Sequence, residues 1–299
     1  METGIGQMEE LEREVSRLRK ENEDLKILLK KRPLPSSSEE EAEEYESKKS
    51  CSQQNYHAMP PLPSVEQLSP NQIERYSRQL LLQRGFGVSG QRRLLSSSVL
   101  VIGAGGIGST VLLYLAAAGL GRISVLDFDV VERSNLHRQI IHKDESVGMN
   151  KAVSACRAMV ALNPSLAGHV HPLPYMLTHE NALEIIRDYD CIVDASDNPK
   201  TRYLINDACI LAGKPLISGS AIGSEGQLSV FNWKGGPCYR CLYPKPSITA
   251  GAKSCSDAGV LGPVPGLIGI LQALEVLKVL TETGYVFFVF LFDSSRRTV

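Results

Sequence analysis

The sequence lacks three features that would place it in a specialised class of protein. It has almost no net charge, with 32 lysine and arginine residues against 33 aspartate and glutamate residues, so it carries no electrostatic footprint for nucleic acid. No uninterrupted apolar run reaches the ~18 residues that a membrane span needs, and the longest compact run, residues 286–292, is typical of a buried strand. The chain begins Met1-Glu2-Thr3 and soon becomes charged, without the apolar core of a secretory signal. We therefore expect a soluble cytosolic protein with no direct contact to membranes or nucleic acid.

The cysteines do not form the even, regularly spaced set of a disulfide framework. The 299 residues include seven of them, an odd number, and most lie singly in predicted strands or helices. This usage indicates a reducing compartment. A composition of 43% hydrophobic and 22% charged residues is typical of a globular protein with one large domain or two small ones, plus appendages.

The first 68 residues have the composition of appendages. Over residues 8–32, apolar residues and Asn22 recur at alternating spacings of four and three, which is the seam of a two-stranded coiled coil. A solitary amphipathic helix is the alternative. Pro33 ends this pattern, so we predict a coiled-coil helix over residues 1–33. Residues 34–68 are acidic, then proline-rich, with few apolar side chains, and predict a disordered linker.

Residues 97–129 predict one strand–turn–helix–strand unit. Two short apolar runs, 99–102 and 123–126, flank a G-x-G-x-x-G turn at residues 103–108 and a stretch of helix-forming residues. The glycines allow the backbone to approach a phosphate at the start of the helix. Asp127, after the second run, can accept a hydrogen bond from a ribose hydroxyl. The unit therefore predicts a nucleotide site, and taken alone it fits NAD as well as ATP.

The remaining pattern predicts an α/β fold with a doubly wound, mostly parallel sheet. Further strands are expected at residues 169–177, 191–195 and 215–218, an antiparallel one at 227–231, and a last one at 286–292. Helices are expected at residues 151–162, 181–189, 201–212 and 267–280. The domain, residues 69–299, opens with a helix that is capped by Ser69 and has Pro70 in its first position.

Several polar residues follow the predicted strands, on the usual ligand side of an open α/β sheet. They are Asp127, Asp129, Asn135, Arg138, Lys151 and Asp197. An arginine and a lysine beside a phosphate loop suit the charge of a polyphosphate transition state. Asp197 can hold Mg²⁺ against phosphate oxygens. Each of these would singly be an ordinary loop residue, and it is their joint position that predicts a site.

Seven ordered motifs resemble those of the MoeB/ThiF family, relatives of the ubiquitin-activating enzymes. They are RYSRQ (75–79), GAGGIG (103–108), LDFD (126–129), SNLHRQ (134–139), Lys151, ASDN (195–198) and CYRC (238–241). KSCSDAGVLGP (253–263) and LQALEVLK (271–278) more specifically resemble the family's eukaryotic molybdopterin-synthase adenylyltransferases and sulfurtransferases, which also serve tRNA thiolation. The resemblance covers about residues 68–280.

The resemblance implies ATP-dependent adenylation of the C-terminal glycine of a ubiquitin-like sulfur-carrier protein, for molybdopterin synthesis and tRNA wobble-uridine 2-thiolation. The implied ATP-binding residues are Gly106, Asp127, Ser134, Asn135, Leu136, His137, Arg138, Lys151, Asp197 and Asn198. Asp127 would bind the ribose, Asp197 would coordinate Mg²⁺, and Asn135, Arg138 and Lys151 would contact the phosphates. Arg78 matches the family arginine that reaches into the site of a partner subunit, which implies a homodimer.

The resemblance also assigns roles to three cysteines. Cys255, in a stretch rich in glycine and proline, would take the carrier as a glycyl thioester, with Lys253 as the nearest cation in sequence. An inert loop cysteine is the alternative. Cys238-x-x-Cys241 is half of a tetrahedral zinc site, which the family completes with a second C-x-x-C. No cysteine follows Cys255 and no histidine follows position 179, so zinc binding stays open. A redox role for the pair is less consistent, because no thioredoxin-like strand and helix flank it.

The eukaryotic relatives continue into a rhodanese-like sulfurtransferase domain, whereas this sequence stops at Val299. We therefore expect an alternative or partial product that has adenylyltransferase activity and no sulfurtransferase activity. Two alternative functions stand beside this one. They are an NAD-dependent oxidoreductase and a truncated chain that binds the carrier without turnover. Binding the pyrophosphate of NAD does not require as many charged side chains as this sequence offers in Arg138, Lys151 and Asp197. The identity of the carrier and the source of sulfur are left open.

Overall fold

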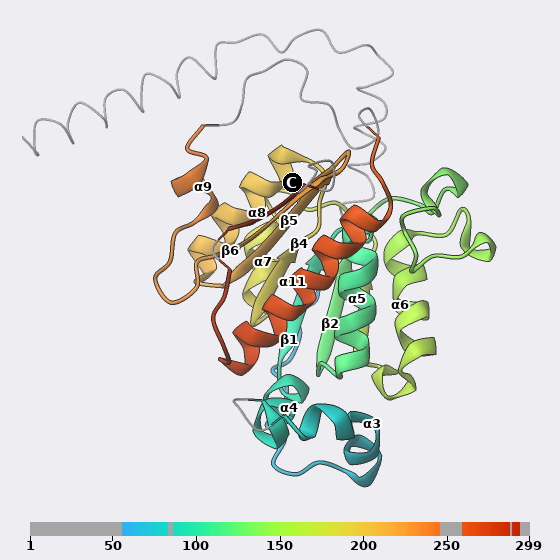
Figure 1. Ribbon diagram of the computed structural model, residues 1–299, viewed down its shortest axis with the longest axis vertical. Coiled ribbons are helices and arrows are strands. Elements are labelled where there is room, and N and C mark those ends of the chain that lie inside the picture. The colour runs from blue at the N-terminus through green and yellow to red at the C-terminus, as the bar shows by residue number, and fades with distance from the viewer. Residues whose placement is uncertain (1–55, 83–85, 246–258, 288, 294–299) are drawn as a thin grey trace, which may run out of the picture. The chain divides into compact units, whose positions relative to one another are not determined.

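A seven-stranded sheet forms the centre of the fold. The computed structural model describes residues 56–82, 86–245, 259–287 and 289–293. In this part the strand order is β3-β2-β1-β4-β5-β6-β7 (Figure 1). The parallel strands are β1 (Ser98–Ile102), β2 (Arg122–Leu126), β3 (Val170–Leu173), β4 (Cys191–Asp194) and β5 (Leu216–Ile222). The antiparallel strands are β6 (Glu225–Phe231) and β7 (Phe290–Asp293). The doubly wound, mostly parallel α/β fold is confirmed.

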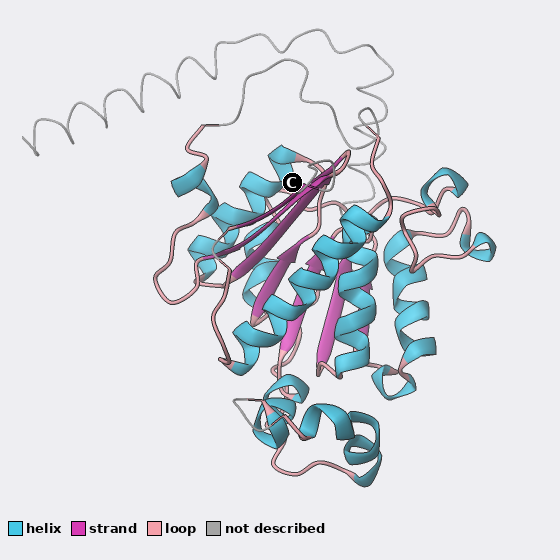
Figure 2. Ribbon diagram, in the orientation of Figure 1, coloured by secondary structure: helices cyan, strands magenta, loops and turns pink. Residues whose placement is uncertain are grey.

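Helices cover both faces of the sheet (Figure 2). One face carries α5 (Gly106–Ala118), α6 (Lys151–Leu162) and α11 (Pro263–Thr281), and the other carries α7 (Ala182–Arg187) and α8 (Pro199–Ala212). Alternation along β1 divides the core, because Val99 and Val101 belong to the α5 side while Leu100 and Ile102 belong to the α7–α8 side. Every residue of β1 is buried, as a strand covered on both faces requires.

Capping residues and a glycine determine where α5, α6 and α8 begin or end. The side chain of Asn150 caps α6 by accepting from Val153 N, and the side chain of Asn198 caps α8 by accepting from Lys200 N. α5 ends at Gly119, whose φ of 80° favours glycine. These ends fix where Lys151 and residues 196–198 meet the sheet.

Close packing of α11 on α5 depends on Gly269. A Cβ at this position would collide with the carbonyl of Ile107 and with the Thr110 hydroxyl. That hydroxyl donates to Gly266 O at 2.9 Å, which ties the two helices together. By length and composition α11 is long and apolar enough to cross a membrane, the one such helix in the described part, and 56% of its apolar window is buried in the fold.

Gly269→Ala will destabilise the fold by roughly 1–3 kcal/mol, because the added methyl group must push α11 away from the α5 backbone. Thermal or denaturant unfolding measures the effect. Gly266→Ala is the matched control one turn earlier, where a Cβ would meet only the Thr110 methyl at 3.8 Å. If both variants unfold at the same midpoint, the Gly269 contact does not set the distance between the helices.

Two further helices lie at the end of the sheet opposite the cavity. α3 (Pro70–Leu80) has the predicted Ser69 cap, with Gln72 completing a reciprocal capping box. α4 (Gly87–Leu95) was not predicted. The remaining elements of the described part are short: η2 (Arg133–Asn135), η3 (Asp144–Ser146), η4 (Pro164–Leu166) and α9 (Tyr239–Leu242).

The predicted coiled coil, residues 1–33, lies outside the described residues, as does the predicted linker up to residue 55. From residue 56 onward the segment predicted as linker makes specific hydrogen bonds to the domain. Tyr56 donates to Asp188 at 2.8 Å, and Arg92 donates to Val65 O at 2.7 Å. Val65 N in turn donates to the Ser96 hydroxyl at 2.9 Å.

Candidate active site

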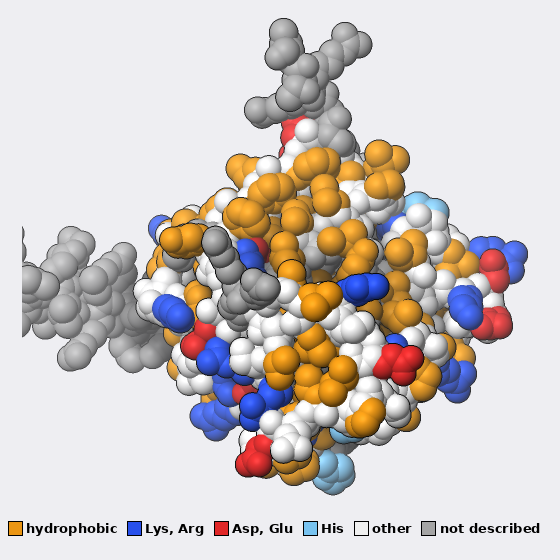
Figure 3. Space-filling model, turned by 60° about the horizontal axis from the view of Figure 1, so that its bottom comes forward, with side chains coloured by type: hydrophobic (Ala, Val, Ile, Leu, Met, Phe, Trp, Pro, Cys, Tyr) orange, Lys and Arg blue, Asp and Glu red, His pale blue; other side chains and the backbone are white. Residues whose placement is uncertain are grey.

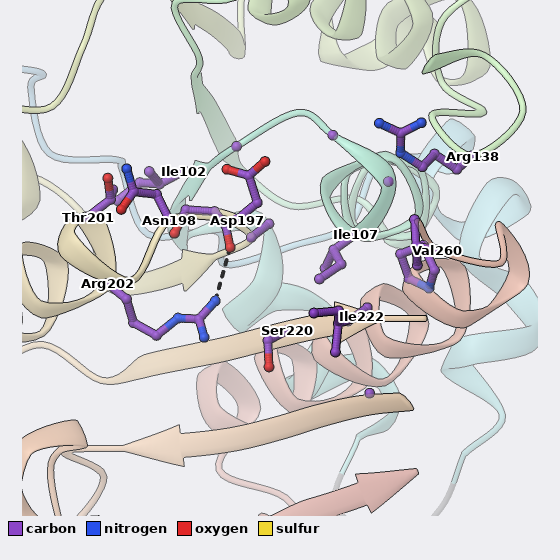
Figure 4. A pocket seen from close by; sticks show the side chains of 18 of the residues that line it. Ile102, Ile107, Arg138, Asp197, Asn198, Thr201, Arg202, Ser220, Ile222 and Val260 are labelled. Carbon is purple, nitrogen blue, oxygen red and sulfur yellow. Dashed lines mark hydrogen bonds between the residues drawn. The ribbon is translucent and has the colours of Figure 1, made fainter. Parts of the chain in front are cut away.

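A cavity of about 870 Å³ opens at the carboxyl ends of the parallel strands. It lies between β1 and β4, where the chain changes from building one side of the sheet to building the other, which is the usual ligand position in doubly wound sheets. Its walls include the glycine turn (residues 103–108), the ends of β2 and β4, and the start of α8 (Figure 4). Gly106, Asp127, Arg138, Lys151, Asp197 and Asn198 of the predicted site line this cavity.

The glycine turn is shaped by contacts that only glycine allows. Gly103 has a φ of 102°, and a Cβ there would lie 2.6 Å from Ala195 O. At Gly106 a Cβ would lie 3.2 Å from the Pro265 side chain of α11 and 3.6 Å from Arg138 Cγ. The first turn of α5, whose N–H groups have no partner within a helix, lines the cavity at Gly106 and Ile107. This shape can accommodate a phosphate at the start of α5.

Asp127 holds the glycine turn from the end of β2. Its carboxylate accepts from Ala104 N at 2.7 Å and from Asp129 N at 2.9 Å. Burial raises the pKa of this carboxyl above its usual value, although the Lys151 ammonium and the two backbone donors act in the opposite direction. In the next peptide group along the chain, His142 Nε2 lies 2.9 Å from Ala104 O. Asp127 and His142 thus fix Ala104 from both sides.

The ribose role predicted for Asp127 implies that adenosine binding weakens on acidification at a pH above 3.8, the ordinary aspartic acid value, because protonated Asp127 would lose an acceptor for a ribose hydroxyl. The native state holds this proton more tightly than the unfolded chain, so the contribution of Asp127 to stability is present at low pH and lost as pH rises. Protonation of Asp127 does not destabilise the fold, so weaker adenosine binding at low pH could not be attributed to unfolding caused by this carboxyl group. Calorimetric titrations with adenosine, which has no phosphate to titrate, measure the effect. Asp127→Asn should bind weakly at every pH; a variant with the wild-type pH profile would contradict the assignment.

Lys151 opens α6 and reaches the cavity from a buried position. Only 7% of the residue is exposed, and its ammonium lies 2.9 Å from the Asp129 carboxylate, which is half exposed. Asn150 secures this junction by donating to the carbonyls of Asp127 and Asp129. The sequence therefore places one fixed cation beside the carboxyl end of β2.

Arg138 is the second cation of the cavity. Figure 4 shows it across the glycine turn from Asp197. Its guanidinium donates to Asn135 Oδ1 at 2.8 Å and to Ser134 O at 3.3 Å. Ser134, Asn135, Leu136 and His137 do not themselves line the cavity. The structure brings Arg138 of this predicted segment to the cavity, with Asn135 behind it.

Asp197 and Asn198 follow β4 and line the opposite wall. Asp197 is exposed to the cavity, and Asn198 is engaged as the cap of α8. Arg202, one turn into α8, donates to Ser196 O at 3.0 Å, drawn as the dashed line in Figure 4. Together with Gly106, Asp127, Arg138 and Lys151, these residues surround one space with three cations, of which Arg202 is bound to protein acceptors, and several acceptors.

Comparison with known proteins agrees with this geometry. The sequence profile of the ThiF family matches residues 76–297. The chain belongs to the ThiF family. Adenylyltransferase and sulfurtransferase MOCS3 of Arabidopsis thaliana is 57% identical over 217 residues, which are 73% of this chain and 46% of the relative. The protein of the same name from Dictyostelium discoideum is 54% identical over 215 residues, 72% of this chain and 50% of the relative. The chain spans about half the length of these curated relatives.

A solved structure shares the ThiF fold. E. coli MccB crystallised with ATP superposes with a TM-score of 0.58 at 22% identity, over 81% of this chain and 75% of that one. This likeness concerns the fold alone. Membership of the ThiF family does not favour the NAD-dependent oxidoreductase or the non-catalytic alternative.

Besides residues 134–137, four residues singled out by resemblance to the ThiF family lie away from the cavity or outside the described part. Arg78 is on α3, which packs through Gln79 on Ala118 O at the far end of α5, ~20 Å of helix from the glycine turn. Cys255 lies outside the described residues. Cys238 and Cys241 have their sulfur atoms 3.6 Å apart, at α9. The described part contains no group of three or more metal-ligating side chains, so zinc is not supported there.

Gln139 and Arg202 are two polar side chains among the lining residues of this cavity that were not predicted as site residues. Gln139 is 4% exposed, and its Oε1 has no hydrogen-bond partner in the described part. Gln139 is the last residue of the SNLHRQ motif (134–139), and this was the available signal. Arg202 carried no local signal, because its partners become adjacent only when β4, β5 and α8 assemble.

Proposed function

We propose that this chain uses ATP and Mg²⁺ to adenylate the C-terminal glycine of a ubiquitin-like sulfur-carrier protein. The observation that carries the proposal is the placement of Arg138, Lys151 and Asp197 around a glycine turn in one cavity. Support comes from the curated relatives that are more than half identical, whose printed name is adenylyltransferase and sulfurtransferase. We extend the proposal to molybdopterin synthesis and tRNA wobble-uridine 2-thiolation, on the resemblance described above.

The cavity fits a magnesium nucleotide by its donor set. An exposed carboxylate at Asp197 faces a phosphate cradle, and Mg²⁺ prefers one or two carboxylates together with phosphate oxygens. When bound, Mg²⁺ neutralises phosphate charge. Asp127 is positioned for the ribose, and Asn135 would act through its hydrogen bond to Arg138. Ser134, Leu136, His137 and Asn198 would shape the nucleotide site through their backbone or through helix capping.

The carrier's terminal carboxylate is already ionised at neutral pH, so its attack on the α-phosphorus needs no general base. One carboxylate oxygen forms the bond to phosphorus, and the bond from phosphorus to the β-phosphate bridging oxygen breaks. Arg138 and Lys151 stabilise the charge that develops on the α-phosphate and on departing pyrophosphate. The remaining contribution is alignment of the two reactants.

We further propose a homodimer, because Arg78 lies away from the cavity of its own chain and, by the resemblance, would reach that of a second copy. The α5–α11 side carries exposed apolar side chains suited to such a contact, namely Tyr114, Ile270 and Leu274. Figure 3, which turns the lower end of Figure 1 toward the viewer, shows apolar side chains gathered on the face presented there. Light scattering of the purified chain tests this part of the proposal.

The other elements of the proposal rest on resemblance. Cys255 would receive the activated glycine as a thioester, with AMP as the leaving group. Sulfurtransferase activity is not proposed for this chain, and zinc is not proposed for Cys238 and Cys241. We propose the cytosol as its location.

ATP–pyrophosphate exchange tests the proposed function. Radioactive pyrophosphate should enter ATP only when the full chain is given a ubiquitin-like carrier that ends in Gly-Gly. The same carrier without its last glycine is the control. Carrier binding without exchange would favour the non-catalytic alternative, and a requirement for NAD would favour the oxidoreductase.

A further inference from the structure

Asp194, the last residue of β4, is a fully buried carboxylate with a complete set of donors. One oxygen accepts from Ser196 N at 3.0 Å and from Ser196 Oγ at 2.6 Å. The other accepts from Arg202 Nε at 3.0 Å and from Ser218 Oγ at 2.8 Å. Its side chain is 0% exposed, and a buried charge persists only when it is paired and hydrogen-bonded. The carboxylate therefore anchors Arg202 in one orientation.

Arg202 uses the rest of its guanidinium to hold backbone on two sides of the cavity. Its Nη2 donates to Ser196 O at 3.0 Å and to Gly219 O at 3.2 Å. The carbonyl of Asp194 is fixed as well, because the buried amide of Gln272 donates to it at 2.9 Å. Side chains from α8, β5 and α11 thus converge on residues 194–196, immediately before Asp197.

Asp197 depends on this backbone for its direction. Among the residues that the structure describes, no hydrogen bond or ion pair holds the Asp197 carboxylate itself, and the side chain is exposed to the cavity. The same backbone touches the glycine turn, where the missing Cβ of Gly103 leaves room for Ala195 O. A shift at Ser196 would therefore move Asp197 relative to the phosphate cradle.

We propose that Arg202, anchored on Asp194, is a positioning residue that sets the direction of Asp197 toward the Mg²⁺ of bound Mg-ATP. This inference rests on the proposed function in so far as it takes Mg-ATP as the ligand. Arg202 acts through the carbonyl of Ser196, and its Nε and Nη2 are occupied by protein acceptors. Loss of these contacts should weaken the metal-dependent part of ATP binding and spare the metal-independent part.

Calorimetric titration of the full chain with ATP, once with Mg²⁺ and once with EDTA, separates the two parts. In Arg202→Lys and Arg202→Gln, the gain in ATP affinity that Mg²⁺ provides should fall roughly 10- to 100-fold, the range typical when a residue that orients a metal ligand is lost. Affinity in EDTA should change by less than about threefold. Arg93→Gln is the matched control: it removes an arginine that holds the Thr281 carbonyl and the Glu282 carboxylate at the other end of the sheet.

A double variant keeps the test decisive if the single ones fold poorly. Removing Arg202 alone leaves a buried carboxylate unpaired, whereas Asp194→Asn with Arg202→Gln removes both charges together. The inference is overturned if folded Arg202 variants keep the wild-type gain from Mg²⁺, or if the wild-type chain gains no affinity from Mg²⁺. A wild-type chain that gains affinity from Mg²⁺ but shows no carrier-dependent exchange would instead overturn the proposed function, and the Arg202 comparison would still decide the inference.

Discussion

Lys151→Ala will lower carrier-dependent ATP–pyrophosphate exchange by roughly 10²- to 10³-fold, the loss that follows removal of one preorganised donor from a charge-stabilising site. The ammonium is positioned by the start of α6 and by Asp129 at 2.9 Å, within a cavity that also holds Arg138. In the proposed complex, the polyphosphate would compete with Asp129 for this ammonium. Because Lys151 is 7% exposed, its charge is poorly screened by solvent and acts strongly on a nearby phosphate.

The fold should survive this change. Asp129 is half exposed, so water can solvate its carboxylate once Lys151 is removed, and the cost in stability should be on the order of 1 kcal/mol. Lys143→Ala is the matched control, since Lys143 pairs with Glu145 at 3.6 Å on the exposed surface. Equal exchange rates for the Lys151 and Lys143 variants, with both proteins folded, would remove Lys151 from the proposed chemistry.

Where a short segment contains its own signal, the sequence predicted the fold closely. The helix over residues 151–162 was predicted with the bounds that α6 has, because Asn163-Pro164 stops it. The structure adds that Asn150 caps its start. The strand before the glycine turn was also recognised, since β1 is apolar from Val99 to Ile102. In both places local propensity and tertiary burial favour the same structure.

Elements that depend on partners were predicted less well. The fifth strand was expected to end at residue 218, but β5 continues to Ile222 because β6 pairs with it in antiparallel register over its full length. The last strand was expected over residues 286–292 and begins at Phe290, after a connection that Glu275 holds by accepting from Phe287 N. α4 carries two glycines in nine residues and weak helix signals, and its buried Leu94 packs only once α5 and the sheet are in place.

Some residues of the candidate site could likewise be predicted from the sequence, whereas others depend on tertiary contacts. Gly106, Asp127 and Lys151 follow strand ends or open helices, so their convergence could be inferred from topology. The anchor at Asp194 could not, because its side-chain donors come from positions 196, 202 and 218 and meet only in the folded sheet. In the sequence Asp194 was simply the polar end of an apolar strand.

Asp197→Ala should reduce the exchange rate by ~10³-fold or more, because a magnesium ion supplies several kcal/mol of transition-state stabilisation and each 1.36 kcal/mol is tenfold in rate. Asp197 is exposed and no hydrogen bond of the described part involves its carboxylate, so the unfolding midpoint should not change. Affinity for ATP in EDTA should also be retained. Asp144→Ala, which removes an exposed surface carboxylate paired with Arg133 at 3.4 Å, is the control for loss of one acid.

The double variant Lys151→Ala with Asp197→Ala distinguishes a shared role from separate ones. If Lys151 and the metal held by Asp197 stabilise charge on the same phosphates, the combined loss will be smaller than the product of the two single losses, as for residues that act as a unit. Separate roles in binding and in folding would instead give losses that multiply. A multiplicative result, with both single variants folded, would show that the two residues do not act on a common transition state.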